Sequence, residues 1–251
     1  MEFWQGVESQ SWKQSSLGIL DWYLSTKPHS VFLDIGAWIG PLSLYAAHIA
    51  TTVYAIEADP TAFSALNANF KLNPTLEART RLFFECILAQ SAPQTQMVGV
   101  GDGTSRIAEI VNDVGLRGGA SWPVKCRSLS DFFSQEKIAL DSISLLSLDV
   151  VGVELDILAS MPLLFKAGGV TAAANKPAIL LNVYAPAWKD AESADHALRV
   201  AAAWKFVSTY KFIYQVDTNN MSPVKKDDGP AFCMTQGCLM LLSDGEYGGA
   251  K

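Results

Sequence analysis

The hydrophobic and polar positions along the chain follow two alternating patterns. Apolar residues fall on one helical face in residues 16–25, which predicts a first helix that ends before Pro28. Residues 30–35 are rich in β-branched and apolar residues, as in a short strand, and a helical pattern resumes at Pro41. The alternation predicts strands at 30–35, 51–57, 81–88, 142–149, 178–184, 211–216 and 237–243, and helices at 41–50, 60–72, 128–135, 153–165 and 191–210.

Strands that alternate with helices predict an open α/β fold, with helices on both faces of a mostly parallel sheet. The strand at 178–184 is almost entirely apolar, as a central strand of such a sheet is. Residues 89–122 depart from the alternation and are rich in glycine, so we expect an irregular or hairpin insertion there. The chain has no repeat of fixed period and no low-complexity linker, so we expect residues 1–251 to form a single domain with a helical lead-in at 1–29.

Composition narrows the class of protein. The chain has 251 residues, of which 49% are hydrophobic, and a formal net charge of −6. This apolar fraction predicts a folded protein, and the negative charge argues against a protein that binds the nucleic-acid backbone. Charged residues interrupt the long apolar stretches, and residues 1–14 lack a basic start and an apolar block. We therefore expect no membrane span and no secretory signal, with a cytoplasmic location as the default.

The four cysteines show no metal-binding pattern. Cys86, Cys126, Cys233 and Cys238 include no CxxC pair and have no histidine at ligand spacing, so no metal site is expected. We interpret the four residues as reduced thiols buried in strands.

A loop with two glycines follows the first strand of the sheet. In an open α/β sheet, ligands bind beyond the carboxyl ends of the strands, and the first strand–loop–helix unit usually holds them. Residues 34–40 contain Gly36 and Gly40 but lack the G-x-G-x-x-G that admits a pyrophosphate. Asp34 repels phosphates and favours a cationic ligand. We therefore predict a site for S-adenosylmethionine, whose carboxylate can accept hydrogen bonds from the loop amides while its ammonium and sulfonium lie near the acid.

A second acid supports this ligand. Glu57 ends the strand at 51–57, where a carboxylate can accept hydrogen bonds from both ribose hydroxyls. The alternative is structural, with Gly36 and Gly40 making a tight turn and Glu57 capping the next helix. The residues that we expect to bind the donor are Asp34, Gly36, Ala37, Trp38, Gly40, Glu57, Ala58, Asp59, Cys86 and Asp149.

The motifs resemble those of the FkbM-type S-adenosylmethionine-dependent methyltransferases, which have the class I methyltransferase fold. Residues 31–40 are similar to the family's Asp-x-Gly-Ala-x-x-Gly motif, residues 53–60 to its acid motif, and residues 142–158 to its segment at strand four. The resemblance implies a Rossmann-like sheet of seven strands, mostly parallel with an antiparallel last strand. It also implies an O-methyltransferase that acts on a small-molecule or sugar-like hydroxyl, with S-adenosylmethionine as cofactor.

The segment at strand four departs from the family pattern at two positions. Ser147 stands where the family usually has lysine and Val151 where it usually has glutamate, whereas Asp149, Gly152 and Glu154 match. If the missing groups orient the acceptor or assist proton removal, the chain either uses other groups or binds the donor without turnover. A catalytically silent binding module is therefore one alternative, and an NAD-linked dehydrogenase is another, which the loop disfavours.

Methyl transfer to a hydroxyl needs an aligned acceptor and a base for its proton. Asp149, at the end of the fourth strand, is the candidate catalytic residue, for contact with the donor's ammonium or for orienting the acceptor. Its alternative role is the N-cap of the helix at 153–165. Trp38, Tyr184 and Trp188 are candidates for an acceptor pocket, and residues 102–105 form either a lid or an ordinary surface loop.

Overall fold

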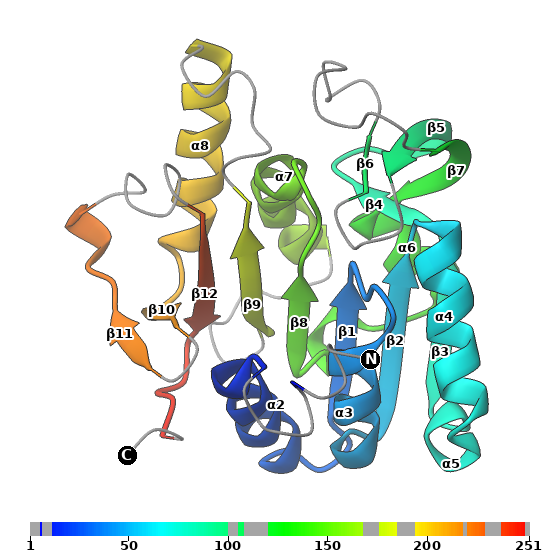
Figure 1. The fold of residues 1–251 in the computed structure, drawn as a ribbon. Coiled ribbons are helices and arrows are strands. Elements are labelled where there is room, and N and C mark those ends of the chain that lie inside the picture. The colour runs from blue at the N-terminus through cyan, green and yellow to red at the C-terminus, as the bar shows by residue number, and fades with distance from the viewer. Residues whose placement is uncertain are drawn as a thin grey trace.

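The computed structural model describes residues 6, 12–99, 105–107, 120–167, 176–184, 194–217, 220–228 and 237–248. Within these residues, the central sheet is built from β1 (Val31–Ile35), β2 (Thr52–Glu57), β3 (Thr80–Phe84), β8 (Leu145–Leu148), β9 (Ala178–Val183), β10 (Phe212–Val216), β11 (Met221–Pro223) and β12 (Cys238–Ser243). The strands lie in the order β11-β10-β12-β9-β8-β1-β2-β3 (Figure 1). The order reverses between β1 and β8, and ligands of open α/β sheets bind at such a point.

The strand directions confirm the predicted fold class. β3, β2, β1, β8 and β9 run parallel, whereas β12 runs antiparallel to both of its neighbours, β9 and β10. This is the mostly parallel sheet with an antiparallel last strand expected of a Rossmann-like class I methyltransferase fold. The expected number of seven strands is corrected, because β11 pairs antiparallel with β10 and is the eighth strand within the described residues.

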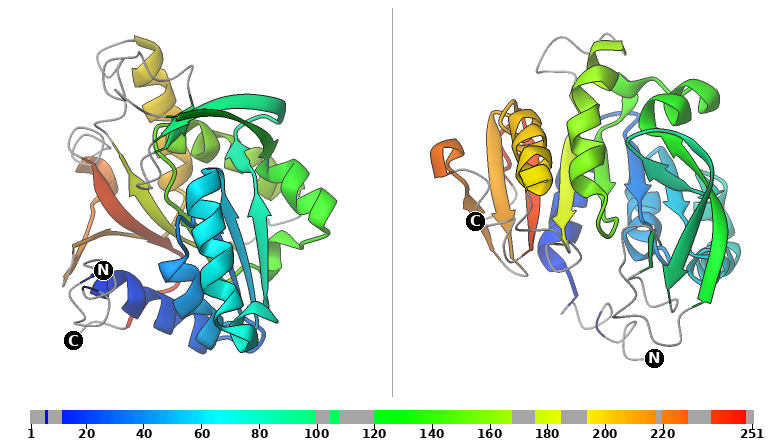
Figure 2. Two further views of the ribbon diagram at one scale, coloured as in Figure 1. Left: turned by 45° about the vertical axis from the view of Figure 1, so that its right-hand side comes forward. Right: turned by 90° about the horizontal axis from the view of Figure 1, so that it is seen from above.

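Helices cover both faces of the sheet and divide its core in two. One face packs against α2 (Gln14–Ser25), α3 (Pro41–Ile49) and α4 (Pro60–Lys71), and the other against α6 (Leu129–Glu136), α7 (Glu154–Ala167) and α8 (Ala194–Val207) (Figure 2). Side chains alternate between the faces along each strand. Phe32 and Leu145 therefore join the core on the α2 side, whereas Leu33 and Leu146 join the core that includes α7.

Short elements complete the described fold. A four-residue helix, α5 (Pro74–Glu77), leads into β3, and the 3-10 turns η1 (Leu140–Ser142) and η4 (Lys226–Asp228) precede β8 and β12. The turn η1 shortens the strand expected at 142–149. Within the described residues, no helix combines the length and apolarity needed to cross a bilayer.

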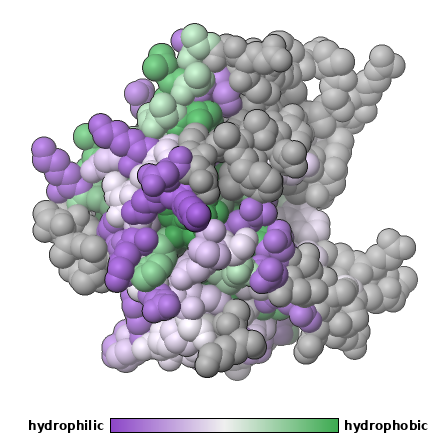
Figure 3. Space-filling model, turned by 90° about the vertical axis from the view of Figure 1, so that its left-hand side faces the viewer, coloured by the Kyte–Doolittle hydropathy of each residue, from purple (hydrophilic) through white to green (hydrophobic). Residues whose placement is uncertain are grey.

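The edge strand β11 is three residues long. In Figure 3, which turns the left-hand side of Figure 1 toward the viewer, the coloured part of the surface is mostly hydrophilic, with smaller apolar areas. A short edge strand in polar surroundings limits pairing with strands of other chains.

A second, smaller sheet occupies the region where the sequence predicts an insertion. It contains β4 (Cys86–Leu88), β5 (Ala92–Gly99), β6 (Arg106–Ile107) and β7 (Ala120–Ser128), in the order β4-β7-β5-β6. Within the described residues, β5 pairs antiparallel with both β6 and β7, so the region predicted to be an irregular or hairpin insertion contains antiparallel strands.

The strand predicted at 81–88 is two strands in the structure. The chain leaves the central sheet at Glu85, which separates β3 from β4. Glu85 is buried, and its Oε2 accepts a hydrogen bond from Arg127 Nε at 2.8 Å. Arg127 Nη1 also donates to Glu136 Oε1 at 2.9 Å. A buried carboxylate needs such a cationic partner, and the pair joins the second sheet to the point where the chain changes direction.

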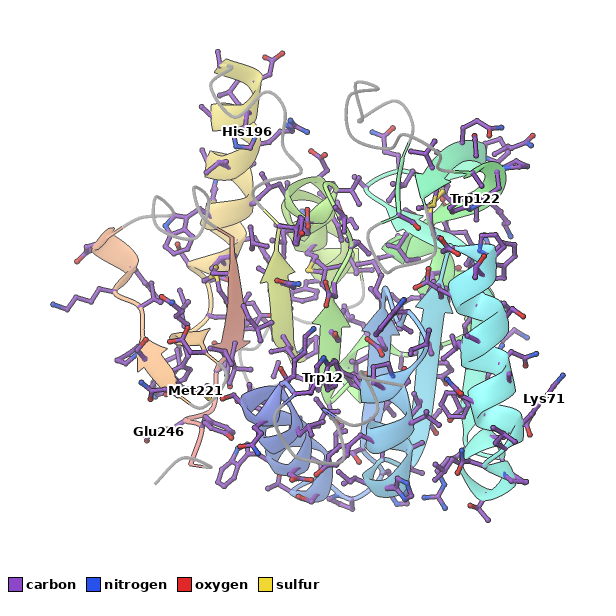
Figure 4. The ribbon with its side chains drawn as sticks, viewed as in Figure 1. Trp12, Lys71, Trp122, His196, Met221 and Glu246 are labelled. Carbon is purple, nitrogen blue, oxygen red and sulfur yellow. A yellow bond between two sulfur atoms is a disulfide. The ribbon has the colours of Figure 1, made fainter. Side chains whose placement is uncertain are left out.

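The interpretation of the cysteines as reduced thiols is wrong for three of them. Cys86 on β4 and Cys126 on β7 are register partners with their Cα atoms 4.5 Å apart, and they form a disulfide. Figure 4 shows this yellow bond in the second sheet, in the neighbourhood of Trp122. Cys238, at the start of β12, is disulfide-bonded as well. The sequence could not show the first pairing, because the two residues meet only when the second sheet forms.

Candidate functional site

A cavity of about 230 Å³ lies at the carboxyl ends of β1, β2 and β8, where the strand order reverses. It is called the donor cavity below. The predicted residues that line it are Gly36, Trp38, Glu57, Ala58, Asp59, Cys86 and Asp149. A smaller cavity adjoins it and is lined by Asp34, Ala37 and Ser147, together with Gly36, Trp38 and Asp149. The structure therefore brings nine of the ten predicted donor-binding residues to one place.

The exception is Gly40, which lies just before α3 and lines neither of these two cavities. Its φ of +90° lies in the left-handed region that favours glycine, and a Cβ there would also come close to the end of the Leu66 side chain on α4. Gly36 also has a positive φ, of +85°, and a Cβ there would collide with the carbonyl oxygen of Asp149. The absence of a side chain at Gly36 lets the loop after β1 lie directly against the end of β8.

The Glu57 side chain accepts hydrogen bonds from backbone groups of three residues that line the donor cavity. Its Oε1 accepts hydrogen bonds from the backbone N–H groups of Ala58 at 2.8 Å and Asp59 at 2.7 Å, and its Oε2 accepts one from Trp38 N–H at 2.7 Å. Burial raises the pKa of Glu57 to about 7, although the three amides oppose the shift. The carboxylate thus links the glycine loop to the end of β2.

The cap of α4 is Asp59, not Glu57. Asp59 Oδ1 accepts hydrogen bonds from Thr61 N–H at 2.8 Å and Ala62 N–H at 3.0 Å. The structural alternative for Glu57 as a helix cap is therefore excluded. Instead, Glu57 directs its carboxylate into the loop that borders the cavity.

Asp34 is a buried acid of the site, with 2% of its surface exposed. Ser43 Oγ donates to its Oδ2 at 2.6 Å, and it also has a hydrogen bond with the Ser147 side chain. Burial raises the pKa of Asp34 to about 6, and the two hydroxyls oppose this shift. Ser147 stands where the FkbM-type proteins usually have lysine, and in this structure its side chain is a hydrogen-bond partner of Asp34.

Asp149 lies at the centre of the site and bonds two residues from distant elements. Its Oδ2 accepts a hydrogen bond from Lys13 Nζ at 3.1 Å, and its Oδ1 accepts one from Asn182 Nδ2 at 2.7 Å. Because α7 begins at Glu154, Asp149 is too far from it to be its N-cap. The Glu154 carboxylate accepts from Gly152 N–H at 3.0 Å and from Tyr184 N–H at 3.3 Å.

Lys13, Asn182 and Trp12 are the site residues that the sequence did not indicate. Lys13 precedes the first turn of α2 with a φ of 43°, and its ammonium lies 5.5 Å from the centroid of the Trp12 ring. Figure 4 labels Trp12 beside the start of α2. Asn182 was detectable as the polar residue in an otherwise apolar strand. For Lys13 there was no local signal, because only the folded chain brings it to Asp149.

The second sheet supplies one wall of the donor cavity, through Cys86, Ile87 and Met97. Trp122 Nε1 donates to the carbonyl oxygen of Ala58 at 2.9 Å and fixes the sheet to the end of β2. Ser105, the one residue of the suggested 102–105 segment that the structure describes, lines the cavity and donates to Asp59 Oδ2.

Tyr184, Trp188 and Trp38 are the residues predicted to form an acceptor pocket. Tyr184 follows β9 and is partly exposed, and among the described cavities it lines neither of the two above. Trp188 lies outside the described residues, as do residues 102–104. Trp38 borders both cavities, as expected.

Comparisons with known proteins give similarity in fold only. No family model matches the chain, and no curated protein matches it. Among solved structures, the methyltransferase FkbM from Methylobacillus flagellatus KT is 12% identical with a TM-score of 0.44, covering 84% of this chain and 43% of its own. Precorrin-6y C5,15-methyltransferase from Geobacter metallireducens GS-15 is 10% identical with a TM-score of 0.40, covering 93% and 90%.

A third solved structure is the SAM-dependent methyltransferase from Agrobacterium tumefaciens, 10% identical with a TM-score of 0.46, which covers 93% of this chain and 62% of its own. The chain thus spans less than two thirds of the FkbM and Agrobacterium proteins. Likenesses at this distance do not assign an activity, so the assignment rests on the geometry of the site.

Proposed function

We propose that the protein is an S-adenosylmethionine-dependent methyltransferase that methylates a hydroxyl group of a small molecule. The observation that supports it is the arrangement of Asp34, Glu57 and Asp149. Asp34 lies one residue before the end of β1, Glu57 ends β2 and Asp149 follows β8, so the three acids border two adjoining cavities at the switch point of the sheet. A molecule with two cationic groups and a vicinal diol matches this set of carboxylates.

The residues of the donor cavity fit the parts of this donor. Glu57 Oε2 has a single amide donor, so it retains a lone pair for a ribose hydroxyl. The side chains of Ile56, Ile87 and Met97 give the same cavity an apolar wall suited to a flat base. The acidic groups disfavour a pyrophosphate, which argues against an NAD-linked dehydrogenase.

In methyl transfer, the main task of the protein is to align the acceptor hydroxyl with the methyl group and the sulfur. The bound donor supplies a methyl group that is already activated by its sulfonium. The acceptor oxygen forms a bond to the methyl carbon, the carbon–sulfur bond breaks with its electrons remaining on sulfur, and the hydroxyl proton goes to a base. We assign that base to Asp149, because it lies at the end of β8 on the border of both cavities. Lys13 and Asn182 hold its two oxygens in place.

Lys13 argues against the alternative that the protein binds the donor without catalysing methyl transfer. The family lysine is replaced by Ser147, but the Lys13 ammonium reaches the site from the other end of the chain. A cationic group next to Asp149 is therefore present in spite of the departure. This favours an active enzyme over a module that binds the donor without turnover.

Calorimetry with S-adenosylmethionine and S-adenosylhomocysteine tests the donor site directly. We expect saturable binding of both, with NAD not binding. A screen for S-adenosylhomocysteine release with a cell extract as the source of acceptors then tests turnover. Absence of donor binding would overturn the proposal, whereas donor binding without turnover on any acceptor would leave the silent module as the better description.

A further inference from the structure

Apart from the donor cavity and the small cavity beside it, a cavity of about 480 Å³ lies on the α2 side of the sheet. It is called the second cavity below. Its walls are the first turn of α2, the end of β10 at Val216 and Asp217, and the start of β12 at Leu239. Trp12 and Lys13 border it as well. The same two residues line the donor cavity and the small cavity at Asp34, so this space adjoins the donor site at Trp12 and Lys13.

Strand register connects this cavity to the candidate base. Val216 on β10 pairs with Leu239 on β12, and Leu239 pairs with Asn182 on β9. Paired residues of antiparallel strands point to the same face of a sheet, so the three side chains form one row. Asn182 Nδ2 then donates to Asp149 Oδ1 at 2.7 Å. The row leads from the second cavity to the carboxylate at the edge of the donor cavity.

Ser16 provides an independent sign that the cavity binds a ligand. The residue is 1% exposed and lines the cavity. Among the described residues, its Oγ has no hydrogen-bond partner. A buried hydroxyl without a partner is destabilising unless another polar group satisfies it. A hydroxyl group of a bound molecule would provide that partner.

Building on the proposed methyltransferase activity, we propose that this cavity is the acceptor subsite and that it takes an uncharged ring bearing several hydroxyls. The Trp12 side chain offers an apolar contact, and Ser16 and Asp217 offer hydrogen bonds. The ammonium of Lys13 is already paired with Asp149. Because the Asp217 carboxylate also lines the cavity, one cationic and one anionic side chain border it, and the cavity favours neither an anion nor a cation. In this position, a hydroxyl of the acceptor can approach Asp149 past Lys13.

The test is binding of hydroxyl-rich probes to the full chain saturated with S-adenosylhomocysteine. Methyl glycosides of the common hexoses and myo-inositol are titrated by calorimetry. The variant Leu239→Trp fills the cavity from β12, and Ser16→Ala removes the unpartnered hydroxyl. Ser25→Ala is the matched control, because Ser25 lies exposed at the other end of α2.

We expect at least one probe to bind the wild-type protein and the Ser25→Ala variant equally. Its dissociation constant should rise about tenfold or more in Leu239→Trp and about threefold in Ser16→Ala. The affinity for S-adenosylhomocysteine should stay within about twofold in all three variants, since none of the changed residues lines the donor cavity.

Three results would overturn the inference, and they are distinguishable. If S-adenosylhomocysteine binds but no probe does, the acceptor subsite is refuted and the proposed donor site stands. If the probes bind Leu239→Trp as well as wild type, they bind elsewhere, and the cavity is not the subsite. If S-adenosylhomocysteine itself does not bind the wild-type protein, both the proposed function and the subsite fail.

Discussion

Lys13 Nζ lies 3.1 Å from Asp149 Oδ2, so the residue that precedes the first described long helix is bound to the end of a central strand. The pair is about one third exposed on each side. An ion pair of this exposure contributes about 1 kcal/mol or less to stability. Its position between the donor cavity and the second cavity indicates a role in positioning.

Replacement of Lys13 by methionine tests that role. We expect turnover to fall about tenfold or more, because Asp149 loses one of the two groups that hold it. The affinity for S-adenosylhomocysteine should change by less than about threefold, and the melting temperature should change little. Lys13→Arg keeps the charge and should restore part of kcat. Equal turnover in Lys13→Met and wild type would show that Lys13 has no part in the reaction.

Replacement of Glu57 by alanine should weaken binding of S-adenosylhomocysteine by about 10- to 100-fold. Hydrogen bonds to a charged group contribute about 1.5–3 kcal/mol, and here they would come from ribose hydroxyls. Calorimetry measures the change, and Glu77→Ala, at an exposed acid on α5, is the matched control. Circular dichroism must show that Glu57→Ala folds, since three backbone amides lose their acceptor. An unchanged dissociation constant in the folded variant would argue against the donor cavity.

Donor binding should also depend on pH through Glu57. Its pKa is raised to about 7 by burial, and the ionised form accepts more hydrogen bonds from hydroxyls than the protonated form. Affinity for S-adenosylhomocysteine is therefore expected to be nearly full at about pH 8 and to decrease as the pH falls through about 7. Calorimetry between about pH 6.5 and 8 measures it. A flat profile would contradict this assignment of the carboxylate.

Asp34 should make the folded protein less stable as the pH rises. Its pKa is about 6 in the folded state against an ordinary 3.8, so the folded state binds the proton more tightly. Stability from this group is full below about pH 4 and is lost as the pH rises through about 6, by about 3 kcal/mol in all. Urea unfolding should show this decrease in wild type and a smaller one in Asp34→Asn. Asp141→Asn, at an exposed position, should behave as wild type.

The disulfide of the second sheet should be a substantial source of stability. Cys86 and Cys126 are 40 residues apart, and closing a loop of that length contributes roughly 4 kcal/mol in the chain-entropy model. The double variant Cys86→Ala/Cys126→Ala should therefore unfold at lower urea than wild type. Ser121→Ala, on the same strand, should change stability by less than about 0.5 kcal/mol. Equal stability of wild type and double variant would show that the bond does not form in solution.

Local sequence patterns predicted the part of the site that is formed by consecutive residues. The strand, loop and helix around Asp34 and Gly36 form one short unit, and Glu57 ends the next strand, so periodicity and glycine placement locate them. The α/β fold class followed from the alternation of strands with helices along the chain. Both predictions concern interactions within about 30 residues, where local preferences decide the structure.

The parts that sequence reasoning missed depend on tertiary contacts. At the break between β3 and β4, the buried carboxylate of Glu85 pairs with Arg127, whereas β-propensity alone continues the strand through this residue. The disulfide of Cys86 requires β4 and β7 to be neighbours. Lys13 reaches Asp149 because α2 packs against one face of the central sheet. No sequence pattern near residue 13 indicates this contact.

The contact between Lys13 and Asp149 has a consequence for the order of folding. The two residues are 136 positions apart, so the contact forms only after the chain between them has closed a long loop. Contacts of such separation are slow to form compared with those inside a strand–loop–helix unit. On a ribosome, the glycine loop and Glu57 emerge early, but the donor cavity is also lined by Cys86, Met97 and Asp149 and is complete only after β8 has emerged. Binding capacity and the contact that holds Asp149 therefore arise at the same late stage of synthesis.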